Sequence, residues 1–148
     1  MLIRVLIVDD QPLQRAGFRL ILESQPDIEV VGEAGDGAQA LSFVRRQPTD
    51  VVLMDIRMPR VNGLTATGRI SEDRQVRALG AAPRVVLVTA LELDEHVPAA
   101  AEVGAFAMLY KDVAPDVLLD AIRGAAAHVA PTVDQAPTPM AGAIDGPA

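Results

Sequence analysis

The chain has 148 residues, of which half are hydrophobic, and its formal net charge is -7. This length suits a single domain with a sizeable core, and the acidic balance without a clustered basic face argues against direct binding of nucleic acid by this chain. The absence of cysteine excludes disulfides and thiolate metal sites.

The amino-terminal residues lead straight into an apolar run at 3–8, without a basic stretch followed by a cleavable apolar segment. No apolar run in the chain approaches the length needed to span a membrane. We therefore expect a cytoplasmic protein that does not associate with membranes.

Short apolar runs alternate with segments of helical periodicity, which predicts an α/β fold whose parallel sheet is covered by helices on both faces. In chain order, the expected elements are a strand at 3–8, a helix from 12, a strand at 29–34, a helix from 38 that ends before 48, a strand at 51–54, a helix at 63–70, a strand at 85–88, a helix at 97–103, a strand at 106–110 and a helix at 116–127.

The helices are expected from apolar spacing and from proline. In the first helix, Leu13, Ala16, Leu20 and Ile21 recur at helical spacing. Pro98 is expected in the first turn of the helix at 97–103. Residues 71–83 should extend the third helix and then form a loop. Residues 129–148 lack Lys, Arg and apolar periodicity, so we expect a domain at 1–128 and a disordered Pro/Ala/Gly-rich tail or linker after it.

Polar side chains follow four of the five expected strands. Asp9 and Asp10 come after the first strand, Asp55 after the third, Thr89 after the fourth and Lys111 after the fifth. The carboxyl ends of parallel strands meet at one edge of a sheet, where ligands bind. Three carboxylates gathered there would repel one another unless a cation lay between them, and their oxygens are the ligands that Mg²⁺ prefers.

The same residues suit phosphoryl transfer. A carboxylate such as Asp55 can attack phosphorus and form an acyl phosphate. The hydroxyl of Thr89 and the ammonium of Lys111 can stabilise the charge on the phosphoryl oxygens.

These residues and their surroundings resemble the receiver domain of two-component response regulators, from Leu2 to about Ala127. The motifs that carry the resemblance are Val-Asp-Asp at 8–10, Met-Asp-Ile-Arg-Met-Pro at 54–59 with Gly63, Thr89-Ala90 and Lys111. The stretch at 30–37 resembles the NarL-type subfamily. The resemblance implies a flavodoxin-like, doubly wound, five-stranded parallel sheet with strand order 2-1-3-4-5.

The resemblance also implies a role for each matching residue. Asp55 would be the phosphoacceptor in a Mg²⁺-dependent reaction, with Thr89 and Lys111 contacting the phosphoryl group. The metal ligands would be Asp10 directly, Asp9 directly or through water, Asp55, and Arg57 through its backbone carbonyl. The donor would be a sensor histidine kinase, and the domain would be a switch rather than an enzyme, with only self-catalysed phosphotransfer and slow autodephosphorylation.

Two departures from the family pattern concern the output. Met108 occupies the position where an aromatic switch residue is usual, and Tyr110 lies one residue before Lys111. NarL-type members usually carry a helix-turn-helix after the receiver, and residues 131–148 do not resemble one. Transcription control through DNA would then need an output domain in a longer protein, and both that arrangement and a stand-alone receiver stay open. The family also allows a homodimer.

Other interpretations of the same residues are weaker. Asp10 or Asp55 could be helix caps, Thr89 a simple strand residue and Lys111 a solvated charge. A phosphohydrolase with an aspartyl nucleophile normally has a second Asp two residues later, which Asp9-Asp10 does not provide. A dinucleotide-binding domain would need a glycine-rich turn after the first strand. A receiver-like module that signals by contact, without phosphorylation, remains the main alternative.

Overall fold

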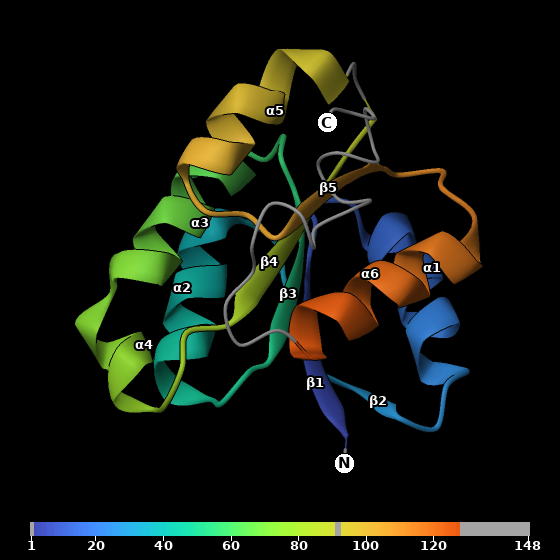
Figure 1. The fold of residues 1–148 in the computed structure, drawn as a ribbon, viewed down its shortest axis with the longest axis horizontal. Coiled ribbons are helices and arrows are strands. Elements are labelled where there is room, and N and C mark those ends of the chain that lie inside the picture. Colours follow the sequence, from blue (N-terminus) through green and yellow to red (C-terminus); the bar gives the residue numbers. More distant parts are fainter. Residues whose placement is uncertain (1, 91–92, 128–148) are drawn as a thin grey trace.

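The computed structural model describes residues 2–90 and 93–127, which form five strands and six helices (Figure 1). The tail expected at 129–148 lies outside the described residues. The strands are β1 Ile3–Val8, β2 Ile28–Ala34, β3 Val51–Asp55, β4 Arg84–Thr89 and β5 Ala107–Tyr110. The helices are α1 Pro12–Glu23, α2 Gly37–Arg46, α3 Gly63–Glu72, α4 Arg74–Ala78, α5 Leu93–Glu102 and α6 Pro115–Ala127.

The strands form one parallel sheet in the order β2-β1-β3-β4-β5, as predicted. In the register, Val8 pairs with Met54 and Asp55 pairs with Val88. Asp9, the residue after Val8, therefore lies beside Asp55 at the carboxyl edge of the sheet. The order of strands changes direction at β1 and β3, and the crevice at such a switch point is where open α/β sheets bind ligands.

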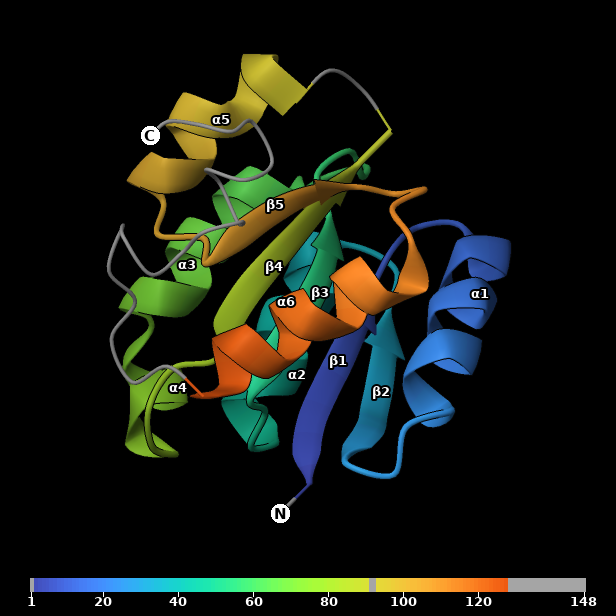
Figure 2. The same cartoon turned by 45° about the vertical axis from the view of Figure 1, so that its right-hand side comes forward.

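Helices cover both faces of the sheet (Figure 2). A hydrophobic core lies on each face. The side chains of β1 alternate between them, because Val5 and Ile7 belong to the core under α1 and α6, while Leu6 and Val8 belong to the core under α2 to α5. This two-sided burial explains why the strands read as continuous apolar runs.

The first helix was predicted correctly, but of its apolar residues at helical spacing only Ile21 packs against the core. Leu13 is 87% exposed and Leu20 is 75% exposed, and Phe18 and Leu22 pack into the core instead. Helical spacing of leucines shows that a helix forms, but the geometry of the β1–α1 connection decides which side of it meets the sheet.

Two other expectations need correction. Residues 71–83 do not simply extend the third helix, because a separate short helix, α4, forms with Asp73 as its N-cap. The Asp73 carboxylate accepts a hydrogen bond from Val76 N at 3.0 Å, and Val76 is buried. The helix expected at 97–103 begins earlier, at Leu93, so Pro98 lies inside α5 rather than in its first turn.

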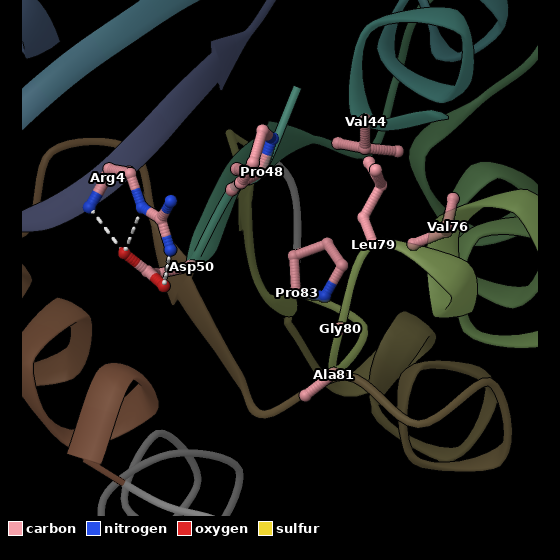
Figure 3. Close-up of a pocket in the computed structure, with 10 residues that line it drawn as sticks. Arg4, Val44, Pro48, Asp50, Val76, Leu79, Gly80, Ala81 and Pro83 are labelled. Carbon is pink, nitrogen blue, oxygen red and sulfur yellow. Dashed lines mark hydrogen bonds and ion pairs between the residues drawn. The ribbon is translucent and has the colours of Figure 1, made fainter. Parts of the chain in front are cut away.

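The opposite edge of the sheet, where the strands begin, carries a shallow hollow of about 190 Å³ (Figure 3). It is lined by Arg4 and Asp50 on one side and by apolar residues such as Leu79 and Pro83 on the other. Arg4 donates through Nε and Nη2 to the two carboxylate oxygens of Asp50, each at 3.0 Å. This paired contact fixes β1 to the start of β3 and leaves no uncompensated charge in the hollow.

Within the described ranges, none of the helices combines the length and the apolar character needed to cross a bilayer.

Gly63, at the start of α3, packs directly on the backbone that carries Asp55. Its N–H donates to the carbonyl of Ile56 at 2.8 Å. A Cβ added at Gly63 would collide with the backbone oxygen of Asp55 and lie 2.9 Å from Ile56 Cα. Only glycine lets α3 begin this close to the end of β3.

We expect Gly63→Ala to lower the free energy of unfolding by about 2 kcal/mol, because backbone atoms cannot move aside as a side chain can. Gly17→Ala is the matched control: Gly17 lies within α1 with open space around it, and the change should stabilise the domain by about 0.5–1 kcal/mol through helix propensity. Urea unfolding measures both. Equal effects of the two substitutions would contradict the close packing described for Gly63.

Candidate functional site

The three predicted acids converge at the carboxyl edge of the sheet. One carboxylate oxygen from each of Asp9, Asp10 and Asp55 lies within 4.8 Å of the other two. Asp9 and Asp55 are buried and Asp10 is exposed. The sheet register brings the first two together, and Asp10 follows directly in the β1–α1 connection.

Lys111 reaches into this group from the end of β5. Its Nζ donates to Asp55 Oδ2 at 3.0 Å and lies 3.1 Å from Asp9 Oδ2. The distance to Asp9 suffices for an ion pair, but Asp9 Oδ2 makes no aligned hydrogen bond within the described part of the chain. One ammonium thus serves two buried carboxylates and leaves one of their oxygens without a donor.

Backbone N–H groups fix the other oxygens of the two buried acids. Asp55 Oδ1 accepts from Arg57 N at 3.2 Å, and Asp9 Oδ1 accepts from Gln11 N at 2.9 Å. Arg57 lies in the exposed loop after β3. The role expected for its backbone carbonyl stays a prediction.

Neither Asp10 nor Asp55 is a helix cap. The N-cap of α1 is Gln11, which makes no capping hydrogen bond through its side chain. The N-cap of α3 is Asn62, whose side chain accepts from Thr65 N at 2.9 Å. The capping interpretation of these two acids is therefore wrong.

Burial and charge act in opposite directions on the pKa values at the site. Burial raises the pKa of Asp55 above its ordinary value, and the nearby Asp9 adds to this, while Lys111 and the N–H of Arg57 oppose it. Burial would lower the pKa of Lys111, but its contacts with Asp55 and Asp9 outweigh burial and raise it. Lys111 is therefore charged at neutral pH, while the ionised form of Asp55 is disfavoured by its surroundings.

Thr89 lies at the end of β4, next to this cluster, and is buried. It lines an open hollow of about 400 Å³ together with Ala90, Tyr110, Lys111 and Asp112. Lys111 N donates to the carbonyl of Thr89 at 3.0 Å, which holds the ends of β4 and β5 together. The hollow gives a small anionic group room beside the hydroxyl-bearing residue and the ammonium.

The two residues near the expected switch position differ in burial. Met108 is fully buried and belongs to the core under α2 to α5. Tyr110 is 42% exposed and is the register partner of Thr89. The aromatic ring at this edge therefore stands beside Thr89 rather than in the core behind it.

One contact to the acidic cluster was not anticipated from the sequence. Arg15 of α1 donates through Nη1 to the backbone carbonyl of Asp9 at 2.6 Å, and its Nε donates to Glu33 of β2 at 2.8 Å. No motif marks Arg15, because the contact depends on how α1 turns back over the end of β1.

The residues at this edge fit a hard divalent cation. Three carboxylates offer oxygen ligands within a few ångströms of one another, and the buried Asp9 Oδ2 has no aligned donor among the residues that the structure describes. Oxygen ligands of this kind are what Mg²⁺ selects. The fold and the cluster together define an open α/β domain with a candidate cation site at its switch point.

Comparison with known proteins identifies the class more closely. Residues 5–123 match the family model described as the response regulator receiver domain. The chain is 40% identical over 126 residues to the uncharacterized transcriptional regulatory protein YxjL of Bacillus subtilis, covering 84% of this chain and 54% of that protein. It is 40% identical over 123 residues to the nitrate/nitrite response regulator protein NarP of Escherichia coli, covering 83% and 54%.

Solved structures of receiver domains are similar to this chain as well. The signal receiver domain of the putative response regulator NarL from Mycobacterium tuberculosis superposes with a TM-score of 0.71 at 34% identity, covering 83% of this chain and 98% of that one. The response regulator domain of Thermotoga maritima CheB gives a TM-score of 0.77 at 32% identity, covering 88% and 100%. The chain belongs to the response regulator receiver domain family. It spans about half the length of the curated relatives it matches.

We expect Asp55→Asn to stabilise the fold at neutral pH in buffer without divalent cations, which should raise the Tm by a few degrees. Because the pKa of Asp55 is raised in the folded state, its ionisation destabilises the fold as pH rises from the ordinary value of 3.8 through the folded value. The gain in Tm should therefore be full at pH values above the folded pKa of Asp55 and vanish below about pH 3.8. It should also shrink when Mg²⁺ is added. Thermal unfolding from pH 3 to pH 8 measures it.

The matched control is Asp112→Asn, which removes an exposed carboxylate close to Lys111 in sequence. This variant should melt within about one degree of the wild type at every pH. A loss of stability in Asp55→Asn at pH 7 without Mg²⁺ would contradict the direction of the shift.

Proposed function

We propose that this receiver accepts a phosphoryl group on Asp55 from the phosphohistidine of a sensor histidine kinase, in a Mg²⁺-dependent reaction. The observation that carries the proposal is the convergence of Asp9, Asp10 and Asp55 with Lys111 at the edge where Thr89 also ends its strand. The group combines a nucleophile, ligands for a cation and two stabilising groups.

In the transfer, a carboxylate oxygen of Asp55 attacks phosphorus. The new bond from this oxygen to phosphorus forms as the bond from phosphorus to the donor imidazole breaks. The imidazole nitrogen keeps the electron pair and takes a proton from solvent, and Asp55 becomes an acyl phosphate. Lys111 helps to keep Asp55 ionised before the attack, against the effect of burial.

The surrounding residues lower the charge cost of the transfer. Asp9, Asp10 and Asp55, with the backbone carbonyl of Arg57, would hold Mg²⁺. When bound, the cation offsets the repulsion between the acids and the incoming phosphoryl oxygens. Thr89 and Lys111 would contact those oxygens from the side of the open hollow, because both line it. Slow hydrolysis of the acyl phosphate by water would reset the domain.

The output would be a change in a protein-interaction surface. The name of YxjL, a transcriptional regulatory protein, supports a role in regulating transcription. We place the receiver at 1–128 and a tail or linker at 129–148. Contact with DNA would require an output domain in a longer protein, and a homodimer is one form the switched surface would take.

Acetyl phosphate with Mg²⁺ should add one phosphoryl group per chain, and intact mass spectrometry measures it. Asp55→Asn should abolish the addition, because an amide is not a nucleophile here. Asp10→Asn should raise the Mg²⁺ concentration needed for half-maximal labelling by about tenfold or more. Glu72→Gln, which changes an exposed carboxylate at the end of α3, is the control and should label like the wild type.

If Asp55→Asn were labelled as strongly as the wild type, Asp55 would not be the phosphoacceptor. Labelling of the wild type that is the same with Mg²⁺ and with a chelator would remove the metal from the proposal.

The phosphate mimic beryllofluoride should alter the fluorescence of Tyr110 when Mg²⁺ is present. Tyr110 is the only tyrosine of the chain, which has no tryptophan, and it lines the same hollow as Thr89 and Lys111. Asp55→Asn should show no change. Size-exclusion elution in the same samples tests whether the surface switches. Altered fluorescence with unaltered association and partner binding would favour the module that signals by contact alone.

A further inference from the structure

Arg15 forms a bridge between three elements next to the acidic cluster. From α1, its guanidinium donates to the carbonyl of Asp9 at the end of β1 and to Glu33 Oε1 in β2. The side chain is only 21% exposed. A guanidinium offers donors in a rigid planar fork, so the two contacts fix one orientation of the Asp9–Asp10 peptide relative to the sheet.

Arg19, one turn further along α1, shows what an ordinary pair on this surface looks like. It donates to Glu33 Oε2 at 2.7 Å and to Glu23 Oε2 at 2.7 Å. Both of its partners are partly exposed carboxylates, and such pairs contribute little to stability. Arg15 differs in that one of its partners is the backbone of a fully buried acid.

Arg15 contacts the Asp9–Asp10 peptide, whose orientation determines where two of the three mutually repelling carboxylates lie. Asp9, Asp10 and Asp55 repel one another, and Asp9 and Asp10 are joined by a single peptide whose rotation moves the Asp10 carboxylate. The N–H of Asp9 is already fixed by a hydrogen bond to Ala34 O at 3.1 Å, and its Oδ1 by Gln11 N. Arg15 fixes the carbonyl, so both backbone polar groups and one carboxylate oxygen of Asp9 are held.

We propose that Arg15 is a positioning residue for the cation site: it holds the Asp9–Asp10 peptide so that both carboxylates face Asp55 before the metal arrives. This inference rests on the proposed function. Glu33 anchors Arg15 to β2 and acts through it. Partners of this kind, outside the ligands themselves, change metal affinity by about 10–100-fold when they are removed.

The test compares Arg15→Met with Arg19→Met, because each removes one guanidinium from the same helix and from the same Glu33. Mn²⁺ is the probe: electron paramagnetic resonance measures the free ion, and Mg²⁺ competes it off. Arg15→Met should weaken binding of both ions by about tenfold. Arg19→Met should leave binding within about twofold of the wild type.

Phosphorylation by acetyl phosphate distinguishes an effect of Arg15 on metal binding from an effect on the phosphoryl transfer itself. In Arg15→Met, the Mg²⁺ concentration for half-maximal labelling should rise by the same factor as the dissociation constant, while the rate at saturating Mg²⁺ recovers to within about twofold. Arg15→Lys keeps the charge but not the fork, so its metal affinity should be intermediate. It also provides the measurement if Arg15→Met does not fold.

Wild-type metal affinity in folded Arg15→Met, or in Arg15→Lys if only that variant folds, would overturn the inference. An equal loss in Arg19→Met would do the same, because it would indicate a general charge effect. The failure of the proposed function looks different, since the wild type itself would then neither bind Mn²⁺ nor label on Asp55.

Discussion

Repulsion between carboxylates at one edge of the sheet is the constraint on which the rest of this domain depends. Asp9 and Asp55 are buried next to each other, and Asp10 follows Asp9 directly. A single ammonium, from Lys111, compensates two of the three. Placing these groups together costs stability, and the two-sided apolar core, the parallel register and the N–H groups of Gln11 and Arg57 hold them in place. The site is thus prepared for positive charge to enter.

The same constraint explains why the backbone around the site is so closely packed. Gly63 lets α3 begin against the backbone of Asp55, which leaves the backbone that carries this carboxylate little room to shift. Arg15 acts similarly on Asp9 from the other side. Because the sheet, α3 and α1 each limit one direction of movement, relief of the repulsion has to come from a ligand or from protonation.

Most of the fold and the composition of the site could be predicted from the sequence. Five apolar runs predicted the strands of a parallel sheet, and the resemblance to receiver domains implied their order. Polar residues directly after four of the runs predicted the acids, Thr89 and Lys111 at the site. What the sequence could not provide was orientation. The leucine spacing of α1 did not indicate that Leu13 and Leu20 face outward, and nothing near Arg15 marks its contact with Asp9. Both follow from how α1 sits over β1 and β2, which residue patterns do not encode. The separate helix α4 was missed because its five residues are too few to show periodicity.

The two edges of the sheet differ in how well they tolerate displacements and insertions. At the edge that carries the acids, small displacements alter distances between charges. At the other edge, Arg4 and Asp50 satisfy each other, and the chain passes from α4 into β4 through an exposed turn at Gly80 and Ala81 (Figure 3). Extra residues inserted in this turn would lengthen a surface loop at modest entropic cost. It is therefore the natural place to graft an affinity peptide or a spectroscopic label, because it lies far from the acidic cluster at the other edge.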